Sequence, residues 1–204
     1  MRVGIFGGTF DPVHYGHLLL AEQCREQCQL DSIWFLPSGL PPHKQDAEIT
    51  PGSVRVEMLR LAISGHDDFT INDMELKRTG PTFTVDTLQQ IHKEEDNPEL
   101  KLFFLMGADS LLELKTWREP DRIAQLATIV AVNREGLSLP NPDQLCRELG
   151  SELMSRVVSV AIPRLDLSSS DIRQRVREGK SIRYMTPRAV EVFIQQRKLY
   201  RPAE

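Results

Sequence analysis

Residues 1–17 read MRVGIFGGTFDPVHYGH, and this stretch decides the fold that the sequence predicts. It opens with a short apolar run, residues 2–6, which has the composition of a buried strand. Gly7 and Gly8 break the run, and the segment that follows His17 has helical spacing. A strand, a glycine turn and a helix start in this order let backbone N–H groups approach an anion.

Two histidines, His14 and His17, lie three residues apart where this helix begins, so their side chains can share one face. Imidazoles donate hydrogen bonds to phosphate oxygens and, when protonated, offset negative charge that builds there. A helix cap and a surface residue are the alternative interpretation. Their pairing behind a Gly-Gly-Thr turn favours a phosphate site, and the lack of a third ligand nearby in the sequence disfavours a metal site.

The length of 204 residues predicts one domain, 1–204, with a helical C-terminal part from about residue 168. The net charge of −4 provides no basic excess of the kind that marks non-specific nucleic-acid binding. The 40% apolar and 26% charged residues are typical of a soluble globular protein.

Three cysteines cannot all pair with one another, and Cys24 and Cys28 share the apolar stripe of the first helix. We expect core thiols there, because no zinc-like spacing follows them. Free thiols suit a reducing cytosol. No apolar run approaches ~20 residues and no signal peptide precedes the first strand, so we expect a cytoplasmic protein without a membrane segment.

Further strands are predicted at residues 32–38, 69–76, 101–109, 128–132 and 157–162, with helices between them, one of them capped by Ser53. This alternation predicts an α/β fold, a Rossmann-like doubly wound, mainly parallel sheet with helices on both faces. Ligands of such sheets bind beyond the carboxyl ends of the strands. Polar segments follow the predicted strands at 7–17, 42–44, 107–109, Arg134 and 168–173.

Each later segment also has a structural interpretation. Lys44 is either a solvated loop residue or a cation that closes over a triphosphate, and residues 168–170 are either an N-cap or part of a phosphate site with Arg173. Asp109 is either a helix cap or a ribose ligand, and Trp117 is either core or a stacking surface for an aromatic base.

No GxxxxGK[ST] and no GxGxxG are present, which argues against a P-loop NTPase and the usual dinucleotide fold.

The run Gly7-Gly8-Thr9-Phe10-Asp11-Pro12-x-His14-x-Gly16-His17 resembles the nucleotidyltransferase signature G-x-F-D-P-x-H-x-G-H. Later motifs narrow the likeness, and the chain resembles the bacterial nicotinate-nucleotide adenylyltransferases over almost its whole length. These motifs are Pro42-His43-Lys44, Pro81-Thr82-Phe83-Thr84, Gly107-Ala108-Asp109, Trp117 and Ser168-Ser169-Ser170-x-Ile172-Arg173.

The resemblance implies transfer of AMP from ATP to nicotinate mononucleotide, which gives deamido-NAD and pyrophosphate, with Mg²⁺ brought in by ATP and no protein metal site. It implies catalytic roles for His14, His17, Lys44 and Arg173. The residues that it implies for ATP are Gly7, Gly8, Thr9, Phe10, His14, His17, Gly107, Asp109, Arg134, Ser168, Ser169 and Arg173. Those that it implies for the mononucleotide are Thr9, Lys44, Thr82, Phe83, Thr84 and Trp117.

Three positions depart from the family pattern: Phe83 replaces a common tyrosine, Ser170 a usual threonine and Glu135 a usual proline. The alternatives are an adenylyltransferase acting on pantetheine phosphate, a cytidylyltransferase, and a nucleotide-binding regulator without turnover. Intact His14, His17 and Arg173 argue against the regulator, since a pure binder does not need groups aimed at a leaving pyrophosphate.

Overall fold

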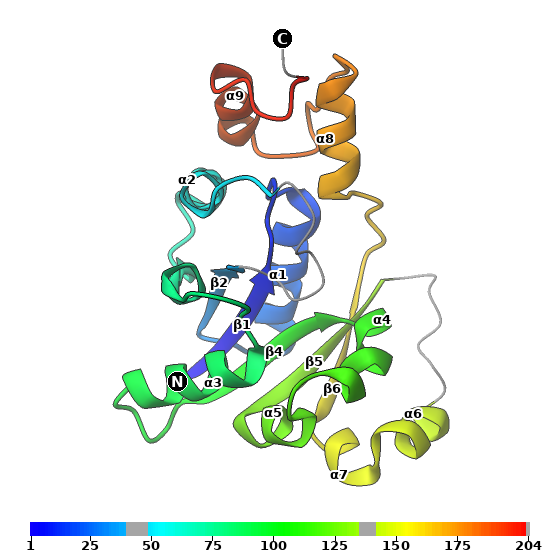
Figure 1. Ribbon diagram of the computed structural model, residues 1–204. Coiled ribbons are helices and arrows are strands. Elements are labelled where there is room, and N and C mark those ends of the chain that lie inside the picture. The colour runs from blue at the N-terminus through cyan, green and yellow to red at the C-terminus, as the bar shows by residue number, and fades with distance from the viewer. Residues whose placement is uncertain (40–48, 135–141, 203–204) are drawn as a thin grey trace.

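Six parallel strands form one sheet in the order β3-β2-β1-β4-β5-β6 in the computed structural model, which describes residues 1–39, 49–134 and 142–202 (Figure 1). The chain runs outward from β1 through β2 to β3, then returns to the other side of β1 as β4. The strand order therefore reverses between β1 and β4, where ligands of doubly wound sheets bind. The strands are β1 (Arg2–Gly8), β2 (Ser32–Pro37), β3 (Phe69–Ile71), β4 (Lys101–Gly107), β5 (Ala127–Arg134) and β6 (Val157–Ile162).

Helices cover both faces of the sheet, which confirms the predicted fold class (Figure 1). Alternate side chains of β4 enter the two cores, with Phe103 and Leu105 on one side and Phe104 and Met106 on the other. The first core is covered by α1 (Tyr15–Gln27), α2 (Gly52–Ile63), α8 (Ser169–Arg177) and α9 (Arg188–Gln196). The second is covered by α3 (Thr84–Glu94), α5 (Pro120–Leu126), α6 (Pro142–Leu149) and α7 (Ser151–Met154).

The predicted strand at residues 69–76 was wrong beyond Ile71. Asn72 ends the ladder, because its Oδ1 accepts a hydrogen bond from the backbone N–H of Met74 over 3.0 Å. The chain then forms the 3₁₀ helix η1 (Met74–Lys77). A side chain that bonds the backbone two residues ahead competes with strand pairing, and alternation of apolar residues does not reveal it.

The predicted N-cap is confirmed at α8 and was wrong at α2. Ser168 caps α8, and its hydroxyl accepts from the backbone N–H of Asp171 over 3.0 Å. The predicted cap Ser53 lies inside α2 instead, because Pro51 occupies the N-cap position and its carbonyl accepts from Val54 and Arg55. α4 (Ala108–Leu111) and the 3₁₀ helix η2 (Leu112–Thr116) follow β4 and lead to Trp117.

The C-terminal helices α8 and α9 lie beyond the carboxyl end of β1, next to α1 and α2 (Figure 1). Two bonds join the segment before α9 to the turn after β1: Thr186 Oγ1 donates to the Val13 carbonyl over 2.7 Å, and Tyr15 N–H donates to the Met185 carbonyl over 3.1 Å. The end of the chain is thus attached to its beginning, at the edge of the sheet where a ligand is expected.

The predicted core thiols are confirmed, because Cys24 and Cys28 are buried in the first core. Cys146 is the exposed cysteine, and all three are free. None of the helices in the described part of the chain is both long and apolar enough to cross a membrane.

Candidate active site

The turn after β1 is shaped by Gly8 and Phe10. A Cβ on Gly8 would lie 2.9 Å from the Phe10 ring, so a side chain there would displace that ring. Phe10 has a φ of 50°, a left-handed conformation that costs a non-glycine residue on the order of 1–3 kcal/mol. Packing of the buried Phe10 ring against Phe6 and Phe35 holds the turn in place, and the turn then leads directly to His14.

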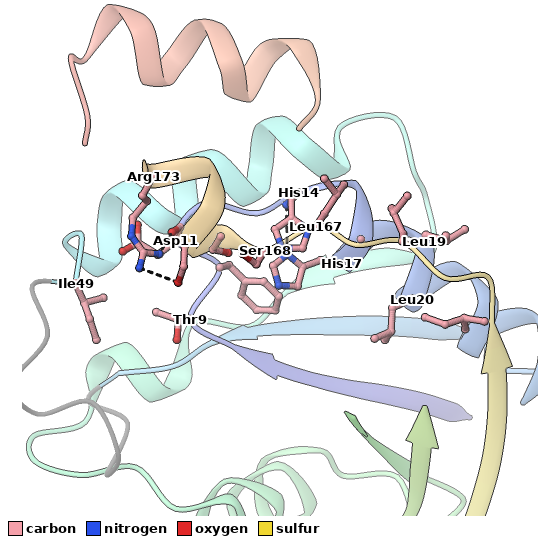
Figure 2. Close-up of a pocket in the computed structure, with 16 residues that line it drawn as sticks. Thr9, Asp11, His14, His17, Leu19, Leu20, Ile49, Leu167, Ser168 and Arg173 are labelled. Carbon is pink, nitrogen blue, oxygen red and sulfur yellow. Dashed lines mark hydrogen bonds between the residues drawn. The ribbon is translucent and has the colours of Figure 1, made fainter. Parts of the chain in front are cut away.

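His14 and His17 lie one over the other at the start of α1 (Figure 2). Their ring centroids are 3.7 Å apart and their planes differ by 26°. The backbone N–H of His14 donates to Nδ1 of His17 over 3.3 Å. An accepting Nδ1 carries no proton, so the proton of a neutral His17 ring sits on Nε2, where it can be donated to a ligand.

The start of α8 comes to the same place from the far end of the chain. Arg173 Nη1 donates to the Asp11 carbonyl over 2.7 Å (Figure 2). Ser169 Oγ donates to the Pro12 carbonyl over 2.9 Å. Arg173 Nη2 also donates to Ser170 Oγ over 3.3 Å. The structure therefore brings the predicted segments 7–17 and 168–173 together.

These two segments line a cavity of about 460 Å³ (Figure 2). Its polar side chains include two imidazoles, a guanidinium and four hydroxyls, on His14, His17, Arg173, Thr9, Ser168, Ser169 and Ser170. The N-terminus of α8 adds the positive end of a helix dipole. Cations and hydroxyl donors around one space favour a ligand with several anionic oxygens, such as a polyphosphate.

A second cavity, of about 270 Å³, lies between β1, α3 and Trp117. The Trp117 ring stands edge-on to Phe104 with centroids 5.9 Å apart, and the Arg118 guanidinium lies 5.0 Å from the centre of the Phe83 ring. α3 begins here at Thr84, and the side chain of its N-cap residue, Phe83, makes no capping hydrogen bond to its first backbone N–H groups. Aromatic faces beside uncapped N–H groups suit a flat ring that carries a carboxylate.

The two cavities meet at the turn after β1, because Gly7 and Gly8 line the second and Thr9 lines the first. Gly7 has open space where its Cβ would be, with nothing within 4 Å. A cavity lined by cations and hydroxyls and a cavity lined by aromatic rings are therefore separated by a strip of glycine backbone. One extended ligand, or two ligands that react with each other, can approach that strip from both sides.

Comparison with known proteins agrees with this geometry. The cytidylyltransferase-like family model matches residues 5–175. A relative from Thermomicrobium roseum is 45% identical over 100% of this chain and 93% of its own length. A relative from Thermus thermophilus is 42% identical over 98% of this chain and 100% of its own. Both are named probable nicotinate-nucleotide adenylyltransferases.

The chain belongs to the nicotinate-nucleotide adenylyltransferase family. Among solved structures, nicotinic acid mononucleotide adenylyltransferase of Plasmodium falciparum, complexed with NaAD, has a TM-score of 0.79 and covers 98% of this chain and 97% of its own. A second structure of that enzyme, complexed with APC, has a TM-score of 0.76. Both are 18% identical to this chain, so they support the fold of this adenylyltransferase-family member.

The family motifs predicted from the sequence divide between the two cavities. Thr9, Phe10, His14, His17 and Arg173 line the first, together with residues 168–170. Thr82, Phe83, Thr84 and Trp117 line the second, together with Gly7 and Gly8, which the resemblance had implied for ATP. This placement puts the two glycines at the boundary between the two cavities.

The structure does not place the four remaining predicted residues in either cavity. Gly107 ends β4 beside β1, and it is not among the described residues that line either cavity. Lys44 lies outside the described residues, as does Glu135. The structure describes the backbone of Asp109 and Arg134, whereas their side chains lie outside the description.

Sequence reasoning missed Arg55, which is 2% exposed in α2. Its guanidinium donates to three carbonyls, those of Thr9, Ser38 and Thr50, over 2.8 to 2.9 Å. Burial lowers the pKa of this guanidinium, and the charge of Asp11 opposes that shift. An arginine on the apolar side of an amphipathic helix was the signal that could have marked it.

Proposed function

We propose that this chain transfers AMP from ATP to nicotinate mononucleotide, giving deamido-NAD and pyrophosphate. The observation that carries the proposal is the junction of the two cavities at residues 7–9, since it supplies a polyphosphate site and an aromatic site on the two sides of one backbone strip. Membership of the nicotinate-nucleotide adenylyltransferase family supports the same reaction.

In this reaction a phosphate oxygen of the mononucleotide attacks the α-phosphorus of ATP in line. The bond from the α-phosphorus to the oxygen bridging to the β-phosphate breaks, and pyrophosphate leaves with the electron pair of that bond. No covalent enzyme intermediate is needed, so the protein contributes by positioning the reactants and stabilising charge.

The first cavity supplies the groups for that stabilisation. His17 presents Nε2–H, and Arg173 retains N–H groups beyond those bound to the Asp11 carbonyl and Ser170. We assign His14, His17 and Arg173 to the phosphates of ATP, where negative charge grows as pyrophosphate departs. Lys44 has the same assignment by resemblance.

The second cavity is assigned to the nicotinate ring. Trp117 provides a face for stacking, and the uncapped N–H groups at the start of α3 can bond the ring carboxylate. The positive end of the α3 dipole also favours a negative group there. Arg118 lines the same cavity, although it already pairs with Asp86 and Glu119. An amide in place of the carboxylate gains less from these groups, so we expect the acid form to be preferred.

We propose that Mg²⁺ enters with ATP, bound mainly by phosphate oxygens and water. Within residues 1–39, 49–134 and 142–202, no cluster of three or more His, Cys, Asp or Glu side chains could hold a metal. Neutralising phosphate charge is the chemistry that the ion supplies. The three free cysteines support a cytoplasmic location for the protein.

One assay tests the proposal. Purified protein with ATP and Mg²⁺ is offered nicotinate mononucleotide, nicotinamide mononucleotide or pantetheine phosphate, and pyrophosphate release is followed. We expect rapid release with the first acceptor alone. Absence of release with all three would refute the transferase activity, and release with pantetheine phosphate alone would reassign the substrate. Equal rates with the two pyridine nucleotides would refute the selection of the carboxylate.

A further inference from the structure

The turn that leads to His14 is held by side chains from distant parts of the chain. Four carbonyl oxygens along it accept hydrogen bonds from α2, α8 and the segment before α9, which fixes the backbone against rotation. The bonds are Arg55 Nη1 to Thr9 O (2.8 Å), Arg173 Nη1 to Asp11 O (2.7 Å), Ser169 Oγ to Pro12 O (2.9 Å) and Thr186 Oγ1 to Val13 O (2.7 Å).

Asp11 is the centre of this arrangement and is 3% exposed. Its Oδ1 accepts from the hydroxyl of Tyr200 over 2.6 Å, and its Oδ2 accepts from the backbone N–H of Thr50 over 3.1 Å. A hydroxyl bonded to a buried carboxylate makes a short, strong hydrogen bond. Tyr200 therefore reaches from the end of the chain to a residue of the turn, 189 positions away in the sequence.

Tyr200 adopts a backbone conformation that is unfavourable for a residue with a side chain. Its φ is 62°, in the left-handed region, and the turn residue Phe10 beside Asp11 has a φ of 50°. Such conformations persist where surrounding contacts over-determine them. Burial raises the pKa of Tyr200, and the carboxylate of Asp11 raises it further, so the hydroxyl keeps its proton and remains a donor.

Packed aromatic rings connect the position of this turn to the positions of the two imidazoles. The Phe10 ring stands edge-on to His17, with centroids 5.0 Å apart and planes at 73°. His17 in turn stacks on His14. A shift of Asp11 would move Phe10, its neighbour in the chain, and with it the ring against which His17 rests.

We propose that Tyr200 is a positioning residue for the adenylyl transfer, because its hydroxyl holds the Asp11 carboxylate and thereby sets the Phe10–His14 turn that aims both imidazoles. This inference rests on the proposed function of the cavity that the imidazoles line. Tyr200 does not line that cavity itself, so it acts through the turn and does not touch substrate.

The test compares Tyr200→Phe with Tyr184→Phe. Both tyrosines have a left-handed backbone, but Tyr184 is 81% exposed, so its substitution is a matched control. We expect Tyr200→Phe to lower kcat about tenfold or more, because small misplacements of reacting groups reduce rates steeply. We expect KM for nicotinate mononucleotide to stay within about twofold, since its cavity is built from other segments. Tyr184→Phe should change neither quantity.

Rates are measured per folded molecule, at a temperature well below the melting point of each variant. If Tyr200→Phe lowers the melting temperature but leaves kcat of the folded enzyme unchanged, the hydroxyl is structural and the proposal is overturned. A KM increase at constant kcat would overturn it as well, because that result places Tyr200 in ground-state binding.

A second readout needs no turnover. The imidazole resonances of His14 and His17 are recorded by NMR in the ligand-free protein, and we expect them to shift in Tyr200→Phe and not in Tyr184→Phe. Unchanged His14 and His17 resonances would overturn the positioning role. A wild-type protein without transferase activity, combined with shifted resonances in Tyr200→Phe, would refute the proposed function while supporting the positioning role.

The double variant Asp11→Asn/Tyr200→Phe tests whether the two residues act as one unit. An amide at residue 11 keeps the shape of the carboxylate and can still accept from Thr50, so the fold is expected to survive. We expect kcat of the double variant to equal kcat of the less active single variant. If the fold-losses in kcat of the two single variants multiply in the double variant, the two side chains act independently and the proposed link between them is overturned.

Discussion

The backbone N–H of His14 donates to Nδ1 of His17 over 3.3 Å, so the helix start itself orients the second imidazole. The bond leaves Nε2 as the protonated nitrogen of a neutral His17 ring. This relationship ties a side-chain tautomer to a feature of the backbone. His14 is buried and ends the turn, whereas His17 is half-buried.

We expect His17→Ala to lower kcat on the order of 10²-fold, as removal of a group that stabilises transition-state charge does. His66→Ala is the control, because His66 stacks on Phe69 and bonds Glu22 away from both cavities. Steady-state kinetics with both substrates measure the effect. A weaker affinity for ATP at unchanged kcat would instead place His17 in ground-state binding.

For Trp117→Ala we expect a higher KM for nicotinate mononucleotide and little change in KM for ATP. The indole lines the second cavity and is the largest aromatic surface there, so its loss removes stacking area from the pyridine ring. Trp117→Phe retains an aromatic face and should show a smaller increase. The stacking assignment fails if the change is confined to ATP.

We expect Arg55→Met to lower the free energy of unfolding by about 2–4 kcal/mol, because buried carbonyls lose their charged donor. Three carbonyls bind this guanidinium, from the turn after β1, the end of β2 and the start of α2. Arg60→Ala on the same helix is the control, since Arg60 is 63% exposed and its ion pair with Glu57 contributes at most about 1 kcal/mol. Urea unfolding monitored by circular dichroism measures both variants, and equal losses would contradict the assignment.

Thiol reactivity provides a prediction that depends on burial. Burial raises the pKa of the Cys24 thiol to about 12 and also raises the pKa of Cys28. A thiol with a raised pKa forms little of the reactive thiolate at pH 8, and both side chains are also inaccessible. We therefore expect a disulfide reagent to modify Cys146 rapidly and the other two slowly in the native protein.

The control for this measurement is Cys146→Ser, which should show no rapid thiol at pH 8. All three thiols of the original chain should react in denaturant. Two rapid thiols in the native protein would contradict the burial of the first core at α1.

Much of the fold follows from local patterns. Continuous apolar runs identified the central strands, and β6 spans the predicted residues. The failures at residues 72–76 and at Ser53 have a common cause, because both depend on which backbone groups a nearby polar or proline residue occupies. Periodicity of apolar side chains carries no record of those bonds.

The sequence by itself determined the strand and helix order, the paired histidines at the start of α1 and the serine cap of α8, because each depends on residues only a few positions apart. Tertiary structure decided which segments share a cavity, and it placed Gly7 and Gly8 in the lining of the second cavity. It also joined Tyr200 to Asp11 and Arg55 to Thr9. These contacts follow from burial of two cores against one sheet, which brings distant segments together without leaving a local pattern in the chain.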